Sequence, residues 1–261
     1  FTSSSFSKCQ SITELTFGNI TTIPSNAFQE DLITSTIDLN IPATINTIGE
    51  GAFKHCIAIK SVTFDANSRI KEISDFLFYE CTNLQSITNL PNTIKSIGAQ
   101  NVQNNGQSFY NCINLETFST PKYLETIRPQ SFMNCKKLKS IELPSSLKVI
   151  GERAFEGCTD LTIDNEIVLS YEITDIGDRI FYGCSSLSGE VKILAGTIVP
   201  TEMFYGCSGI TKLFIQRGIT TISDRAFYGC TSLTDLVAAG VTDINEQAFY
   251  GCTNLVGPVP S

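Results

Sequence analysis

The chain has 261 residues, of which 42% are hydrophobic and 17% are charged, and its formal net charge is −8. This composition is typical of a folded protein, and the sequence has no run of Lys or Arg long enough to follow a phosphate backbone, which argues against a nucleic-acid partner. No stretch of about 18 consecutive apolar residues occurs, so the sequence predicts no membrane insertion.

A short pattern centred on phenylalanine recurs along the whole chain. It has the form F-x-x-C-x-x-[LI] or a close variant, and successive copies are between 22 residues (Phe6 to Phe28) and 31 residues (Phe78 to Phe109) apart. The phenylalanines of this column are Phe6, Phe28, Phe53, Phe78, Phe109, Phe132, Phe155, Phe181, Phe204, Phe227 and Phe249. A repeat of this length predicts a solenoid in which each copy buries its apolar face against its neighbours.

Within each copy the spacing of apolar residues changes. Ile141 to Leu143 alternates as a short strand does, and Glu152 to Glu156 has the pattern of a brief helical turn. The sequence therefore predicts an α/β fold: a right-handed leucine-rich-repeat solenoid with a parallel β-sheet on one face and short helical turns or loops on the other. We expect a single domain over residues 1–261 with about eleven repeats and ends that are truncated or uncapped. The phenylalanines should form a continuous aromatic spine inside the coil.

Three segments depart from the basic repeat. The first is an insertion between Ile97 and Ser108, expected to bulge from the back or side of the coil. The others are Leu161 to Tyr171, which is over length, and Leu187 to Pro200, which lacks the usual Ile-Gly pair. We expect irregular curvature around these last two segments.

The sequence contains ten cysteines, but no C-x-x-C pair at the spacing of a zinc site. Stacked repeats would hold neighbouring cysteines with parallel Cβ vectors, whereas a disulfide needs converging ones, so we expect a reduced structural ladder. His55 is the only histidine and precedes Cys56, which raises the question of a thiolate–imidazole pair. Cys56 belongs to the inward repeat column, however, and no catalytic or phosphate-binding motif occurs. We predict no enzyme activity, no metal and no cofactor.

Residues that alternate with the buried strand positions should point outward from the sheet. In the first half this outward column is rich in Ser and Thr, and we align Asp38 with Thr63 in it. In the second half it becomes apolar and charged, and the candidate protein-binding residues are Phe214, Lys212, Val237, Asp235 and Lys192. An exposed aromatic side chain among charged ones is typical of an interface anchor. The alternatives are that Phe214 packs against neighbouring repeats or meets another copy in a dimer. Four tyrosines that each follow a column phenylalanine are expected to form a ridge on another edge: Tyr182, Tyr205, Tyr228 and Tyr250.

The motif resembles the leucine-rich repeat of BspA-like surface antigens. The resemblance is carried by F-x-G-C-x-x-L at Phe181 to Leu187 and at Phe227 to Leu233, and by I-G-x-x-A-F at Ile48 to Phe53 and at Ile150 to Phe155. It covers the chain from about Phe6 to Leu255, with Asp31 standing where one repeat should have Cys.

That resemblance implies a surface-exposed or secreted module that adheres to host or neighbouring-cell proteins, such as extracellular-matrix or cell-surface proteins. The family has no shared catalytic residues. A structural spacer and an intracellular protein-interaction scaffold are the alternatives, and the oligomeric state stays open.

Overall fold

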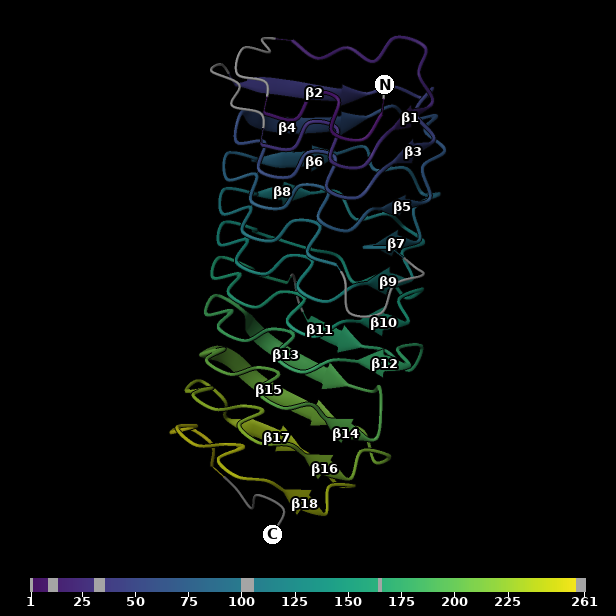
Figure 1. Ribbon diagram of the computed structural model, residues 1–261. Helices are drawn as coiled ribbons and strands as arrows, with labels where there is room; N and C mark the ends of the chain where they lie inside the picture. The colour runs from purple at the N-terminus through teal and green to yellow at the C-terminus, as the bar shows by residue number, and fades with distance from the viewer. Residues whose placement is uncertain (1, 9–13, 31–35, 100–105, 164–165, 257–261) are drawn as a thin grey trace.

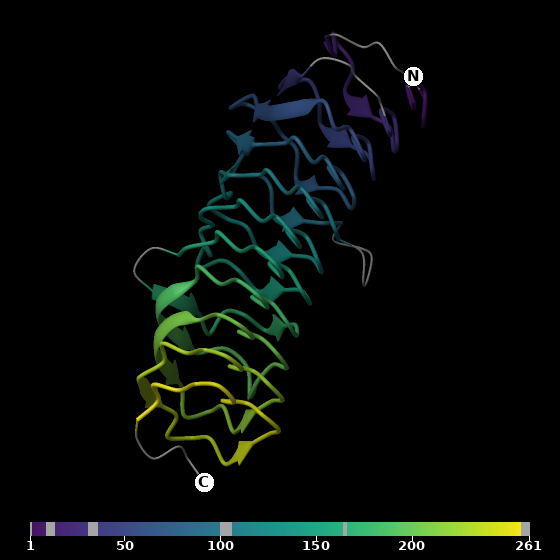
Figure 2. The same ribbon diagram turned by 90° about the vertical axis from the view of Figure 1, so that its left-hand side faces the viewer.

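The chain folds as an elongated parallel β-solenoid. A computed structural model describes residues 2–8, 14–30, 36–99, 106–163 and 166–256. Figures 1 and 2 show the turns stacked along one axis, with the N-terminal turns at one end and the C-terminal turns at the other. Cys9, Asp31 and most of the insertion between Ile97 and Ser108 lie outside the described residues.

Two faces of the coil carry the strands, and every pairing is parallel. Face A holds two four-stranded sheets in the orders β2-β4-β6-β8 and β11-β13-β15-β17. Its strands are β2 (Ile37–Ile41), β4 (Ile59–Phe64), β6 (Ser86–Thr88), β8 (Thr117–Phe118), β11 (Glu166–Leu169), β13 (Ser188–Ile193), β15 (Gly209–Ile215) and β17 (Asp235–Val237).

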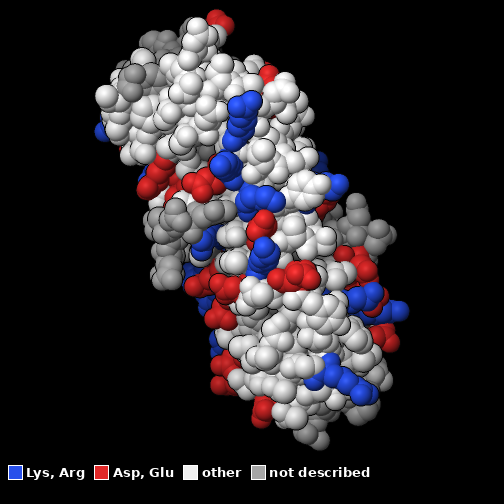
Figure 3. Space-filling model, turned by 90° about the vertical axis from the view of Figure 1, so that its right-hand side faces the viewer, with Lys and Arg blue, Asp and Glu red and all other residues white. Residues whose placement is uncertain are grey.

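Face B, shown in Figure 3, carries two-residue strands. They are β1 (Thr22–Ile23), β3 (Thr47–Ile48), β5 (Glu72–Ile73), β7 (Ser96–Ile97), β9 (Thr126–Ile127), β10 (Val149–Ile150), β12 (Asp175–Ile176), β14 (Ile198–Val199), β16 (Thr221–Ile222) and β18 (Asp243–Ile244). This second ladder is an addition to the single-sheet prediction.

Both ladders are interrupted along the coil. On face A the sheet stops after β8 and resumes at β11, and only the bridge between Ser140 and Thr162 spans the interval. On face B it is interrupted between β3 and β5, and again between β12 and β14. The last interval contains the segment from Leu187 to Pro200. Strand pairing crosses the longest insertion, however, because β7 pairs with β9 on either side of it, so an irregular repeat length does not by itself break the ladder.

The phenylalanine column forms the predicted spine. All eleven rings stack in sequence order, with neighbouring centroids between 5.2 Å and 5.7 Å apart and ring planes within 17° of parallel. From Phe53 to Phe227 every ring of the column is essentially without exposure to solvent. The buried residues of all turns belong to one apolar cluster that runs along the coil.

The predicted helical turns are wrong, because the described residues contain no helix. The residues two before and two after each column phenylalanine have left-handed backbone angles, as at Arg153 (φ 56°) and Gly157 (φ 74°) around Phe155. An α-helix needs consecutive right-handed residues, so each left-handed residue ends a helical turn as soon as it has begun. The fold is consequently a β-solenoid and not an α/β structure.

These phenylalanine-centred segments, which we name the turn side, bond to each other along the coil. The N–H groups of Arg153, Phe155 and Gly157 donate to carbonyls of the next turn at 2.8–2.9 Å. The N–H groups between them, at Ala154 and Glu156, close bonds within their own turn at 3.2 Å. Successive N–H groups thus alternate between bonds to the next turn and bonds within their own turn. The glycine of F-x-G-C supplies one of the left-handed residues at low strain.

Candidate functional site

The five candidate residues lie together on face A. They come from the three adjacent strands β13, β15 and β17, and the register pairs Lys192 with Phe214 and Phe214 with Val237. A second row on the same strands pairs Lys212 with Asp235. Because neighbouring parallel strands are about 4.8 Å apart, each row is a compact line of side chains across the sheet. We name these five residues the face A patch.

The face A patch has an apolar centre with charged neighbours. The side chains of Phe214 and Val237 are 37% and 52% exposed, although they stand side by side on a regular sheet. Lys212 and Asp235 are exposed as well. An aromatic side chain beside a β-branched one, rimmed by charges, has the composition of a protein-binding anchor.

Lys192 is held in place by carboxylates on its own side of the patch. Its ammonium donates to Glu166 on β11 and lies 3.9 Å from Glu190. The hydrogen bond to Glu166 raises the pKa of Lys192, so the side chain is a fixed cation at neutral pH. Glu166 was not among the residues singled out from the sequence, because the over-length segment before it obscures the register.

The outward column was assigned incorrectly at its N-terminal end. The structure pairs Asn40 with Thr63 and Asp38 with Ser61, which shifts the predicted partner of Thr63 by two residues. The register is also irregular between Ile37 and Asp38, at the start of the strand. Farther along, Thr63 pairs with Thr88, and their hydroxyl oxygens are 3.2 Å apart.

The predicted tyrosine ridge exists on the turn side. Tyr182, Tyr205, Tyr228 and Tyr250 stack with centroids 4.5–4.9 Å apart, so that each inner ring turns its faces to its neighbours. An ion-pair network runs beside the ridge: the carboxylate of buried Glu202 lies 2.5 Å from Arg179 and 3.6 Å from Arg225. These contacts fix the side chains of the ridge.

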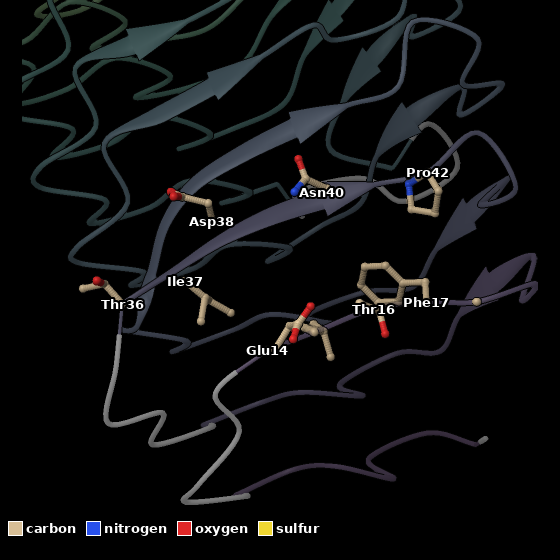
Figure 4. A pocket seen from close by; sticks show the side chains of 10 residues that line it. Glu14, Thr16, Phe17, Thr36, Ile37, Asp38, Asn40 and Pro42 are labelled. Carbon is tan, nitrogen blue, oxygen red and sulfur yellow. The ribbon is translucent and has the colours of Figure 1, made fainter.

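Two recesses open along face A where strand pairing is incomplete. One, of about 460 Å³, lies between β2 and the segment before β1; Figure 4 shows Glu14, Thr16 and Phe17 on one wall and Asp38, Asn40 and Pro42 on the other. The second, of about 540 Å³, lies at the break before β11 and is lined by Glu142, Glu166 and Val168 among others. It shares Glu166 with the ion pair of Lys192 and so adjoins the face A patch.

His55 and Cys56 do not form a reactive pair. The Nδ1 atom of His55 lies 3.2 Å from Glu80, and its ring meets Tyr79 edge-on. The thiol of Cys56 points into the core and donates to the carbonyl of Phe28 at 2.8 Å. The pair is therefore divided between surface and interior.

Each described cysteine makes the same contact. Its S–H donates to the carbonyl of the column phenylalanine in the preceding turn, at 2.8–3.4 Å. Burial raises the pKa of the thiols from Cys81 to Cys252, well above the usual value at Cys158 and to about 11 at the half-buried Cys252. The thiolate is the reactive form, so a raised pKa suppresses reactivity.

We expect the native protein to resist alkylation at pH 8, with Cys252 reacting first among the nine described cysteines. The pKa of Cys252 lies above that pH, and burial raises the pKa of the thiols from Cys81 to Cys230 further, so few of these groups are thiolates at pH 8, while Cys56 is shielded by its burial in the core. Peptide mapping after timed iodoacetamide treatment measures the order, and denatured protein provides the fully reactive control. If Cys158 is labelled as fast as Cys252 in the folded protein, the deeper burial of Cys158 in the structure is contradicted.

Within the described residues no group of three or more His, Cys, Asp or Glu side chains could hold a metal ion. A search of the same residues for membrane-spanning helices finds no helix with the length and apolar character required.

Comparison with known proteins identifies the repeat. The profile of the BspA type leucine-rich repeat region matches residues 1–106, 105–194 and 141–256. Curated protein sequences yield no match.

Solved structures share the fold. A leucine-rich repeat protein of T. pallidum is 24% identical with a TM-score of 0.52, over 75% of this chain and 77% of that chain. A leucine-rich cell surface protein of Faecalibacterium prausnitzii is 20% identical with a TM-score of 0.53, over 85% and 74%. The pneumococcal vaccine antigen PcpA is 20% identical with a TM-score of 0.54, over 86% of this chain and 64% of that chain. The family profile spans nearly the whole sequence, and the chain belongs to the BspA-type leucine-rich repeat family.

Proposed function

We propose that the chain is a protein-binding module of a surface-exposed or secreted adhesin, and that the face A patch contacts the partner. The observation that carries this proposal is the exposure of Phe214 and Val237 as adjacent apolar side chains on an ordered sheet. Repeat families of this kind bind partners through extended solenoid surfaces. Two structurally similar proteins are described as a cell surface protein and a vaccine antigen, which supports a location where host or neighbouring-cell proteins are available.

The face A patch offers both affinity and orientation. Burying Phe214 and Val237 against an apolar pocket supplies the hydrophobic term, and aromatic side chains at the centre of an interface often contribute most of the binding energy. Lys212 and Asp235 surround that centre with opposite charges, and the Lys192–Glu166 ion pair is already formed before binding. Preformed side-chain positions reduce the entropy lost on association.

The experiment begins with binding of the full chain to a panel of purified extracellular-matrix proteins. For a partner found there, Phe214→Ala is expected to weaken binding about thirtyfold, the effect of a hot-spot residue worth about 2 kcal/mol. Surface plasmon resonance measures the affinity. Ile198→Ala is the matched control, because Ile198 is 47% exposed and lies on face B.

Unchanged affinity of Phe214→Ala with an intact circular-dichroism spectrum would remove the face A patch from the binding surface. If the chain binds none of the matrix proteins in the panel, the result counts against adhesion to matrix proteins. Sedimentation analysis of the same variant distinguishes the self-association alternative, in which Phe214 joins two copies and its substitution converts a dimer into monomers.

A further inference from the structure

Face B carries a line of lysines that the sequence disperses over four repeats. The backbone N–H of Lys95 donates to the carbonyl of Lys71, that of Glu125 to Lys95, and that of Lys148 to Glu125, at 2.8–2.9 Å. These bonds place Lys71, Lys95, Glu125 and Lys148 in one row across β5, β7, β9 and β10, about 14 Å long at the spacing of neighbouring strands. Figure 3 shows Lys and Arg side chains following one another along the coil on this face, with acidic side chains among them.

A fourth lysine and a tyrosine complete this surface. The ammonium groups of Lys95 and Lys122 lie 5.1 Å and 5.3 Å from the ring centroid of Tyr123. Tyr123 is 47% exposed, and its ring is engaged by the two cations. We name Lys71, Lys95, Lys122 and Lys148 the basic row.

Glu125 is the only carboxylate within the row itself, and it organises two of the lysines. It accepts a hydrogen bond from Lys148 at 2.9 Å and lies 3.3 Å from the ammonium of Lys95. These two contacts, with Lys148 the stronger, lower the pKa of Glu125, which is therefore ionised at neutral pH. Four lysines against one carboxylate leave a net charge of +3 on the row, in a chain whose net charge is −8.

A recess lies at the end of the row where the face B ladder is broken between β3 and β5. Its volume is about 410 Å³, and Arg69, Lys71 and Glu72 line it together with Asn46, Thr47 and Ile48. Arg69 and Glu72 have opposite charges and cancel. Lys71, by contrast, has no carboxylate at ion-pair distance among the described residues, and neither does Lys122. These two ammonium groups are the cations of the row most open to a ligand.

We propose that the basic row binds a linear sulfated glycan. A single line of cations on a flat ladder suits a single-file polyanion, since each anionic group gains attraction and releases counterions. The exposed ring of this surface, Tyr123, is engaged by Lys95 and Lys122, so it does not offer a protein the bare apolar anchor that Phe214 offers in the face A patch. It also lacks a free aromatic face for stacking nucleic-acid bases, because the Tyr123 ring is engaged by lysines.

The test uses the full chain and immobilised heparin as the sulfated-glycan probe. The triple variant Lys71→Gln, Lys122→Gln, Lys148→Gln, in which Glu125 still neutralises the remaining Lys95, is compared with the control triple Lys136→Gln, Lys137→Gln, Lys139→Gln. Both remove three exposed or half-exposed lysines from the middle of the coil and change the net charge equally, but the control set lies beyond the turn side, next to Ser140.

We expect retention of the native chain and of the control triple, and loss of retention for the row triple. Three contacts to a polyanion correspond to a fall in affinity of roughly forty-fold between 50 mM and 200 mM salt, and that dependence should disappear with the row. Glu125→Gln should bind heparin more tightly, because it removes the anion from the row.

Equal loss in both triples would show that net charge alone governs retention and would overturn the proposal. A native chain that heparin does not retain would overturn the proposal too. So would a competition experiment in which polyglutamate, single-stranded DNA or anionic lipid vesicles displace the chain as effectively as free heparin does. Unchanged or weaker binding of Glu125→Gln would contradict the placement of the ligand along the row. Since the probe and the face differ from those of the face A patch, either proposal can fail while the other stands.

Discussion

Phe155→Ala is expected to lower the free energy of unfolding by about 3–5 kcal/mol, the cost of removing a fully buried aromatic ring. Phe155 is in the middle of the spine, with no exposure to solvent and with ring neighbours at 5.3 Å and 5.4 Å on its two sides. Neither neighbouring turn can close the space left by the ring, because both are held by backbone bonds on face B and on the turn side. The cavity therefore persists and adds to the lost transfer free energy.

The matched comparison is Phe249→Ala, at the last ring of the same stack. Phe249 is only partly buried, and its described ring neighbour in the spine is Phe227 at 5.3 Å. Urea unfolding followed by circular dichroism should give a much smaller loss for this variant. An equal loss at both positions, or a loss below about 1 kcal/mol at Phe155, would show that the spine is not the main source of stability.

Gly151→Ala is expected to cost about 3 kcal/mol, through overpacking of one turn against the next. A Cβ at residue 151 would lie 2.4 Å from the backbone nitrogen of Pro129 and 2.7 Å from the carbonyl carbon of Arg128. Both obstacles are main-chain atoms of the preceding turn, so the two turns themselves must separate. This close approach explains the glycine of the I-G-x-x-A-F motif at that position.

Gly183→Ala separates crowding from backbone strain. Gly183 has φ +72°, but a Cβ there meets nothing within 4 Å, so only the left-handed conformation is penalised, at about 1 kcal/mol. Thermal unfolding of both variants ranks the two effects. A larger loss at Gly183 than at Gly151 would mean that the turns on face B are not in close contact at residue 151.

The spine could be predicted from the sequence because one residue type recurs at one position in every turn. The helical turns were predicted incorrectly because the left-handed residue before each phenylalanine is often Arg, Gln or Glu, as at Arg153 and Glu202. Those side chains carry no signal for that backbone conformation. The glycine after the phenylalanine did carry such a signal, as at Gly157. Face B was missed because two-residue strands such as Val149–Ile150 are too short to show a period.

The face A patch could be located because the pairing of β13, β15 and β17 is regular at the residues of the patch, beyond the irregularity between Gly189 and Glu190. The N-terminal end of the same column was misaligned by two residues, because a shift of two residues keeps the alternation of inward and outward side chains and both Asp38 and Asn40 fit the outward position. The basic row could not be seen at all. Each repeat supplies a single lysine to the row. Lys71, Lys95 and Lys148 become neighbours only because their repeats are stacked on one another in the coil.

The direction of the bonds between turns has a mechanical consequence. On faces A and B and on the turn side they run from one turn to the next, along the long axis of the coil. A pull between the two ends loads this linkage in tension, and the bonds of the outermost turn carry the load before those of the interior. The coil then lengthens in steps, and each released turn of about 23 residues adds on the order of 75 Å of extended chain. Under such a load the coil is expected to give way turn by turn, while the turns that are still bonded keep their shape.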